Sequence, residues 1–188
     1  MARIIKDDID KLFQYGIDLS TKTLVMDSVV DEETSQNMIK GLHVLDNIKP
    51  KEPITIIMEN YGGSVYSGLA IYDFISNCES EVIVKVYGAC MSMAAYILQA
   101  AETRLIAKHA RIMIHTGYTE FHEDHPEIHK RWMKQYEKDD EELEDILLER
   151  IREKHPEFTR EEVKQLLMFD SILLPKKAVE LGLADDII

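Results

Sequence analysis

The sequence lacks an excess of positive charge, and this argues against a nucleic-acid-binding function. Its 22 lysine and arginine residues are outnumbered by 35 aspartate and glutamate residues, which gives a formal net charge of −13. A protein that binds DNA or RNA needs a basic surface that displaces counterions from the phosphates. We therefore expect no nucleic-acid partner and attribute the negative charge to solubility.

Cysteine is scarce, with Cys78 and Cys90 the only two in the chain. Their spacing matches no metal-binding pattern, and two thiols do not make a disulfide scaffold. This favours a reducing compartment, so we expect a cytoplasmic protein. Because Cys90 stands among apolar residues, we interpret it as a packing residue rather than a second nucleophile.

Long hydrophobic runs are also absent. No apolar stretch approaches the ~20 residues that a membrane span requires. The first eight residues turn acidic within one helical turn and contain no apolar core of a signal peptide. We expect no association with a membrane. Linkers rich in Gly, Pro or Ser are missing as well, so the 188 residues predict one domain.

What the sequence does contain is an alternation of short apolar strands and amphipathic helices, which favours an α/β fold with crossover connections. Residues 54–58 form a continuous apolar run, typical of a strand buried on both faces. Residues 1–22 have no clean period, and we expect that segment to be partly extended or mobile. One folded domain is expected over residues 23–188. Further strands are expected at 23–26, 82–87, 104–107 and 111–114, and helices at 31–50, 69–75, 92–101, 128–151, 159–167 and 175–181.

The predicted helix over 128–151 is unusually long. Its apolar residues form one narrow stripe, and the opposite face is densely charged. Such a helix is expected to protrude from the main layer as a handle or to pack against another subunit. The stripe consists of Ile128, Trp132, Tyr136, Leu143, Leu147 and Ile151.

Three features lie at junctions between predicted strands and helices, where backbone amides are free to bind a negative charge. They are the pair Gly62-Gly63, Ser92 at the start of an apolar helix, and His115 at the end of a strand. Each has an ordinary structural explanation: a turn, an N-cap, and a half-buried histidine with satisfied nitrogens. Together they supply the nucleophile, the base and the oxyanion donors that acyl transfer requires.

At this point the sequence resembles a known family, the Clp protease proteolytic subunit (ClpP), of which it looks like a divergent member. The resemblance is carried by residues 62–65, 68–73, 92–93, 111–115 and 178–185, with good coverage from about residue 54 to the end. It implies the ClpP/crotonase-like fold of repeated ββα units. It also implies a serine endopeptidase that cleaves unfolded polypeptides or peptides and needs no cofactor or metal.

The resemblance further implies the roles of individual residues. Ser92 matches the nucleophile, His115 the base and Asp170 the acid of a Ser-His-Asp triad. The amides of Gly63 and Met93 match the oxyanion donors. Asp170 would be unremarkable without the resemblance, although its apolar neighbours suit a carboxylate held out of bulk water to orient a histidine.

For the assembly, the resemblance implies a homo-oligomer of two stacked heptameric rings around a closed chamber, with the long helix at the ring–ring contact. An AAA+ unfoldase ATPase would feed polypeptides into it. Two departures from the family stand out: Tyr61 replaces the usual proline before the glycine pair, and the axial segment is not recognisable in residues 1–22.

Other functions compete with this interpretation. His125 and His129 stand i, i+4 with His122 nearby, but Pro126 intervenes, and a solvated acidic loop is favoured over a metal site. A crotonase-like acyl-CoA enzyme would share the fold and the glycine amides but would not need the serine and histidine. A silent ring subunit would lack a triad member. A phage capsid-maturation or signal-peptide type of peptidase is a further relative; the signal-peptide type uses a lysine base and often a membrane anchor.

Overall fold

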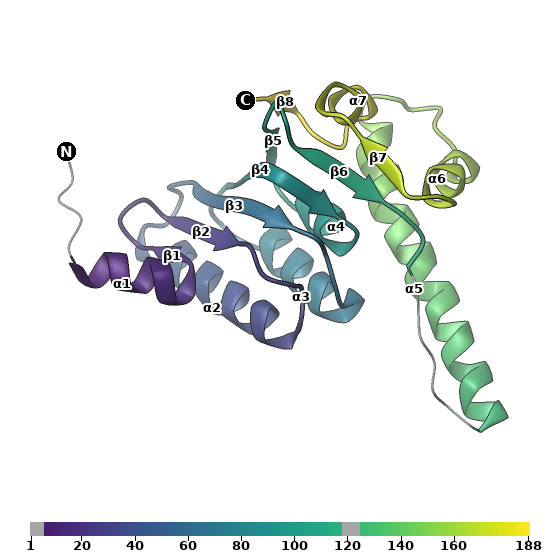
Figure 1. The fold of residues 1–188 in the computed structure, drawn as a ribbon, viewed down its shortest axis with the longest axis horizontal. Coiled ribbons are helices and arrows are strands. Elements are labelled where there is room, and N and C mark those ends of the chain that lie inside the picture. The colour runs from purple at the N-terminus through teal and green to yellow at the C-terminus, as the bar shows by residue number, and fades with distance from the viewer. Residues whose placement is uncertain (1–5, 118–124) are drawn as a thin grey trace.

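The computed structural model describes residues 6–117 and 125–188. It contains an eight-stranded sheet in the order β1-β2-β3-β4-β5-β8, from which β6 and β7 branch at β4 (Figure 1). All pairs are parallel except β1 with β2 and β6 with β7. The strands are β1 (Ile17–Asp18), β2 (Thr23–Met26), β3 (Ile54–Asn60), β4 (Val82–Met91), β5 (Thr103–Ile106), β6 (Arg111–Ile114), β7 (Ser171–Leu173) and β8 (Asp186–Ile187).

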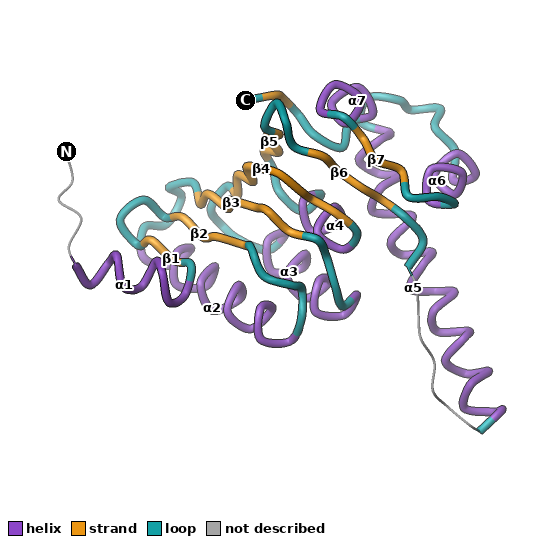
Figure 2. Tube along the Cα trace, in the orientation of Figure 1, coloured by secondary structure: helices purple, strands orange, loops and turns teal. Residues whose placement is uncertain are grey.

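Helices connect the parallel strands, as crossover topology requires. Helices α2, α3 and α4 lie against one face of the sheet, and α5 begins far from the sheet and ends beside β7 and α7 (Figures 1 and 2). The α/β prediction is therefore confirmed. The helices are α1 (Lys6–Tyr15), α2 (Glu32–Ile48), α3 (Val65–Ser76), α4 (Met93–Leu98), α5 (Pro126–Arg152), α6 (Arg160–Leu167) and α7 (Pro175–Leu181).

Local sequence explains where several helices begin and end. Asp31 caps α2, because its carboxylate accepts a hydrogen bond from the amide of Thr34 at 2.8 Å. Thr159 and Glu162 form the capping box predicted at the start of α6. Gly182 ends α7 in the left-handed conformation, with φ +85°, which glycine adopts without steric cost.

The hydrophobic core lies between the sheet and the helices on its covered face. Side chains of β3 alternate, with Ile54, Ile56 and Met58 fully buried and Ile57 36% exposed. The prediction of a strand buried on both faces was wrong for β3 in the single chain, because the helices cover only one face there. The face that carries Ile57 is left for solvent or for another subunit.

The N-terminal segment also differs from expectation. Residues 6–15 form the helix α1 rather than extended chain, and the amide of Gly16 donates to the carbonyl of Leu12 at 2.9 Å. Leu12 and Phe13 stand three and four residues after Ile9, a helical spacing that could have predicted the helix. The helix was not predicted because it is short and its first residues are charged.

The end of the chain is anchored by a buried ionic network. The guanidinium of Arg104, in β5, is 3% exposed and binds both carboxylate oxygens of Asp185, at 2.6 and 3.2 Å. The same side chain donates to the Gln99 side-chain oxygen at 2.9 Å and to the Gly182 carbonyl at 3.0 Å. The network fixes α7 and β8 to the sheet.

Helix α5 is buried in its second half only. Leu143, Leu147 and Ile151 belong to the core, whereas Ile128 and Trp132 are 40% and 42% exposed. The apolar stripe of this helix therefore continues beyond the surface that its own chain can cover, and Figure 1 shows the first turns standing away from the sheet. In the part of the chain that the structure describes, no helix is long and apolar enough to cross a membrane.

Candidate active site

The candidate residues converge because three neighbouring strands end at the same edge of the sheet. β4 lies between β3 and β6, and all three run parallel. Met91, the last residue of β4, pairs with Met113, so Ser92 and His115 follow two adjacent strand ends. β7 runs antiparallel to β6 with Ser171 opposite Ile114, which brings Asp170 opposite His115. Residues distant in sequence are thus aligned by strand register.

Ser92 has a strained backbone. Its φ of +52° and ψ of −128° lie where L-residues are uncommon, and such a conformation costs of order 1–3 kcal/mol. The side chain makes no capping hydrogen bond to α4. Ser92 therefore occupies the N-cap position of α4, as the structural alternative expected, but its hydroxyl does not cap the helix and is directed elsewhere. A sharp, strained turn between strand and helix is a known way to expose a nucleophile.

The hydroxyl of Ser92 is bonded to His115. Ser92 Oγ lies 2.9 Å from His115 Nε2, within hydrogen-bond distance. The imidazole is largely buried, with 14% of its side chain exposed. A neutral imidazole protonated on Nδ1 would accept the Ser92 proton at Nε2, which is the arrangement a general base requires.

Asp170 faces the other nitrogen at a longer distance. Its Oδ1 lies 3.7 Å from His115 Nδ1, which exceeds a normal hydrogen bond. The Asp170 side chain is 61% exposed, and its neighbour Phe169 is 75% exposed. The expectation that apolar neighbours shield this carboxylate from water was wrong for the single chain, because they point outward with it.

The glycine pair lies against the serine. A Cβ added to Gly62 would lie 2.7 Å from Ser92 Cβ and 2.8 Å from the Met93 nitrogen, so only glycine fits there. Val30 donates to the Gly62 carbonyl at 2.9 Å and accepts from the Ser64 amide at 2.7 Å. In a parallel bridge of this kind the two bonds to Val30 are made by the residues on either side of Gly63, so the Gly63 N–H is not used by Val30.

Met93 supplies the second amide. It is the first residue of α4, where helix amides have no acceptor one turn earlier, and it follows Ser92 directly. The Met93 amide therefore lies at a helix N-terminus directly after the serine, where an N–H group can act as an oxyanion donor.

Asn60 is a site residue that the sequence reasoning missed. It is buried, donates to the Ser28 carbonyl at 2.6 Å and accepts from the Gly62 amide at 2.8 Å. Its role is to hold the glycine turn in place. A polar residue at the end of an apolar strand, two positions before the glycine pair, was an available signal.

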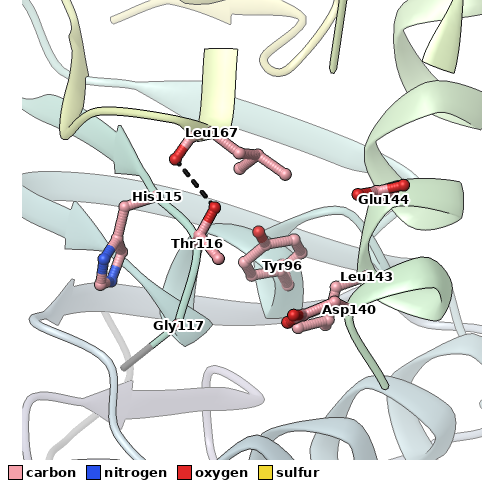
Figure 3. Close-up of a pocket in the computed structure, with 8 residues that line it drawn as sticks. All are labelled: Tyr96, His115, Thr116, Gly117, Asp140, Leu143, Glu144 and Leu167. Atoms are coloured by element: carbon pink, nitrogen blue, oxygen red, sulfur yellow. Dashed lines mark hydrogen bonds between the residues drawn. The ribbon is translucent and has the colours of Figure 1, made fainter. Parts of the chain in front are cut away.

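The reasoning also missed a pocket beside His115. Tyr96, from α4, and two carboxylates of α5, Asp140 and Glu144, line it together with residues that follow β6 (Figure 3). No sequence motif predicted this pocket, because its lining residues come from α4, α5 and the segment after β6, which are far apart in the sequence.

Of the three clustered histidines, His125 and His129 lie in the described part of the chain. His122 lies outside the described residues, and His125 is the N-cap residue of α5. Across residues 6–117 and 125–188, no group of three or more His, Cys, Asp or Glu side chains could hold a metal ion.

Cys90 is fully buried, and burial raises the pKa of its thiol far above the usual value. This agrees with a packing role. The remaining chemistry at this edge of the sheet is that of a serine in contact with a histidine, beside a helix N-terminus. On an α/β sheet this combination defines a hydrolase that acts through a serine.

Comparison with known proteins identifies the kind of hydrolase. The sequence profile of the Clp protease family matches residues 10–188. The ATP-dependent Clp protease proteolytic subunit of Deinococcus radiodurans is 28% identical over 172 residues, covering 90% of this chain and 81% of the relative. The protein of the same name from Bdellovibrio bacteriovorus is 29% identical over 178 residues, covering 90% and 80%.

A solved structure is also similar to this chain and belongs to a ClpP protein. A mutant of ClpP1 from Listeria monocytogenes superimposes with a TM-score of 0.77 at 25% identity, covering 90% of this chain and 92% of that one. The chain belongs to the Clp protease family, and with it to the serine endopeptidases. The predicted family and ClpP-like fold, including the long helix, are confirmed.

Proposed function

We propose that this chain cleaves polypeptides with a catalytic triad of Ser92, His115 and Asp170. The observation that carries the proposal is the 2.9 Å contact between Ser92 Oγ and His115 Nε2, made by a serine whose backbone is strained at a strand-to-helix turn. An N-cap serine would instead direct its oxygen to the amides of its own helix.

The reaction proceeds in two halves. His115 Nε2 takes the Ser92 proton as Oγ bonds to the peptide carbonyl carbon, and the oxyanion is held by the amides of Gly63 and Met93. The carbon–nitrogen bond then breaks, and His115 gives its proton to the leaving amine. Water, deprotonated by the same histidine, hydrolyses the acyl-enzyme and restores Ser92.

Asp170 orients His115 and stabilises its cation, a role that requires a shorter approach than 3.7 Å. We propose that subunit assembly closes this gap, because Asp170 and its apolar neighbours lie exposed beside β7 in the single chain. The active enzyme is then an oligomer of stacked heptameric rings, fed by an AAA+ unfoldase ATPase. Substrates are selected by admission to the chamber as well as by the site.

Labelling with a fluorophosphonate tests the nucleophile. We expect one adduct, mapped to Ser92, which disappears in His115→Ala because the serine loses its base. His109→Ala is the matched control: His109 is exposed, two residues before β6, and that variant should label normally. An intact oligomer with an unlabelled Ser92 would refute the proposed peptidase.

A crotonase-like acyl-CoA function is less well supported. It would use the same glycine amides, but the Ser92–His115 contact would then have no purpose.

A further inference from the structure

The pocket beside His115 is lined by polar side chains that have no role in the catalytic mechanism proposed above. Tyr96 lines it and is only 4% exposed. Among the described residues, its hydroxyl donates to no side chain or carbonyl, and in Figure 3 the ring stands between Thr116 and the two carboxylates of α5. A buried phenol normally finds a hydrogen-bond partner. This one is directed into a space that a ligand can enter.

The two carboxylates of the pocket differ in how they are neutralised. Glu144 is buried and binds Arg160 of α6 at 3.0 Å, with Lys164 at 3.9 Å. Asp140 has no cation within 4 Å in the described part of the chain. Burial and the neighbouring charges of Glu144 and Asp139 raise the pKa of Asp140. Asp140 is itself exposed to solvent, so it places an acidic group without a protein cation at the rim of the pocket.

The remaining walls are partly apolar. Leu143 and Leu167 line the pocket, and the Thr116 hydroxyl is already occupied by its 3.1 Å hydrogen bond to the Leu167 carbonyl (Figure 3). A suitable ligand has an aliphatic stem and a hydrogen-bond-donating positive end. Lysine and arginine side chains combine these properties, burying the stem and presenting the charge to an acidic group.

The pocket is placed to contact a substrate during the reaction. His115 lines it and also touches Ser92 Oγ, and Tyr96 stands four residues after Ser92 along the chain. The acyl part of a substrate stays attached to Ser92 through both halves of the reaction, so its first side chain remains beside these residues. We propose that this pocket selects a basic side chain, lysine or arginine, on the acyl side of the cleaved bond, with Asp140 and Tyr96 as the specificity-determining residues.

This proposal rests on the proposed function, and the test separates the two. Peptidyl diphenyl phosphonates carrying a lysine-like, leucine-like or glutamate-like side chain next to phosphorus react with the serine without turnover. We expect the lysine analogue to label Ser92 about tenfold faster than the leucine analogue, as one charge-assisted hydrogen bond would allow. The glutamate analogue should be slowest.

Variants of the pocket residues test whether the preference for the lysine analogue arises in this pocket. Asp140→Asn should reduce the lysine-to-leucine ratio about tenfold. Tyr96→Phe should lower the same ratio. Glu141→Gln, which removes an adjacent exposed carboxylate of α5 outside the pocket, should leave it unchanged.

Two results would overturn the assignment. One is a leucine analogue that reacts as fast as the lysine analogue, and the other is a ratio that Asp140→Asn does not alter. If either occurs while a simple fluorophosphonate still labels Ser92, the pocket proposal fails alone. If the fluorophosphonate also fails on the intact oligomer, the peptidase proposal fails with it.

Discussion

Ser92 combines a reactive position with a conformation that its neighbours enforce. The strand register of β4 and β6 fixes the residues on either side, and Gly62 lies directly against it. Strain of this kind persists only where surrounding contacts over-determine it. The contact with Gly62 is therefore as much a part of the site as the hydroxyl.

Gly62→Ala tests this contact. The added methyl group would lie 2.7 Å from both Ser92 Cβ and the Met91 carbonyl oxygen, at a φ of +90° that alanine rarely adopts. We expect the turn to shift and the oxyanion donor of Gly63 to be misplaced, which lowers kcat/KM by about 100-fold. Peptide hydrolysis measures the loss, with circular dichroism to verify the fold. Activity within twofold of the parent would contradict the geometry.

The thiols give a prediction about reactivity. Burial, together with the charges of Asp46 and Glu102, raises the pKa of Cys78 to about 11. Because only the thiolate attacks alkylating reagents, and a raised pKa keeps the thiol protonated below pH 11, Cys78 should react on the order of 100-fold more slowly at pH 8 than an unperturbed cysteine.

Iodoacetamide modification followed by mass spectrometry measures the reaction of Cys78, and the urea-unfolded chain is the control. Fast labelling of native Cys78 would show that the packing around it is looser than described.

For individual residues, the sequence could predict which side chains form the site but not how far each side chain is exposed to solvent. Ser92, His115 and the glycine pair follow strand ends that periodicity reveals. The outward position of Asp170 and the convergence of Tyr96 with Asp140 depend on how α4, α5 and β7 pack, and no local pattern encodes that.

Among the elements, the C-terminal α7 and β8 are joined to β5 through the side chain of Arg104 as well as through backbone pairing. Arg104→Ala would leave the Asp185 carboxylate, the Gln99 amide and the Gly182 carbonyl without their cation. Breaking a buried pair by removing one partner typically costs about 3–5 kcal/mol, and we expect a loss of that size in the free energy of unfolding.

Urea denaturation measures the loss. Lys177→Ala is the comparison, since its ion pair with Glu180 is exposed and should contribute less than about 1 kcal/mol. Equal effects of the two variants would refute the structural role of the Arg104 network.

Most elements could be predicted because their signals are local. The capping residues Asp31 and Thr159 marked where α2 and α6 begin, and Gly182 marked where α7 ends. The apolar stripe of α5 predicted that helix. The helix α1 was missed because only three apolar residues mark it. The buried role of Arg104 could not be foreseen, since its partners lie five to 81 residues away.

For the whole molecule, surfaces left uncovered by one chain indicate further copies. The exposed half of α5 carries Trp132 stacked on Tyr136, with ring centroids 5.9 Å apart. We expect sedimentation to give a particle of fourteen 21.7 kDa chains, and Trp132→Asp to reduce it to single rings or smaller species.

Lys134→Ala is the control for the assembly experiment, because Lys134 lies about 200° around the helix from Trp132 and its loss should preserve the particle. A stable, catalytically active monomer would contradict both the assembly and its link to Asp170.

The pairing of β7 with β6 has a consequence for the chain as it is synthesised. Ser92 and His115 can meet once residues up to about 115 have emerged and paired, but Asp170 arrives only when β7 closes onto β6. Domains generally fold as units, the N-terminal part appearing first. In the proposed triad, a nascent chain would therefore carry the serine and the histidine well before the aspartate. Since Asp170 still lies 3.7 Å from His115 in the single chain, the site would be complete only after translation and assembly, and the chain could not digest its neighbours on the ribosome.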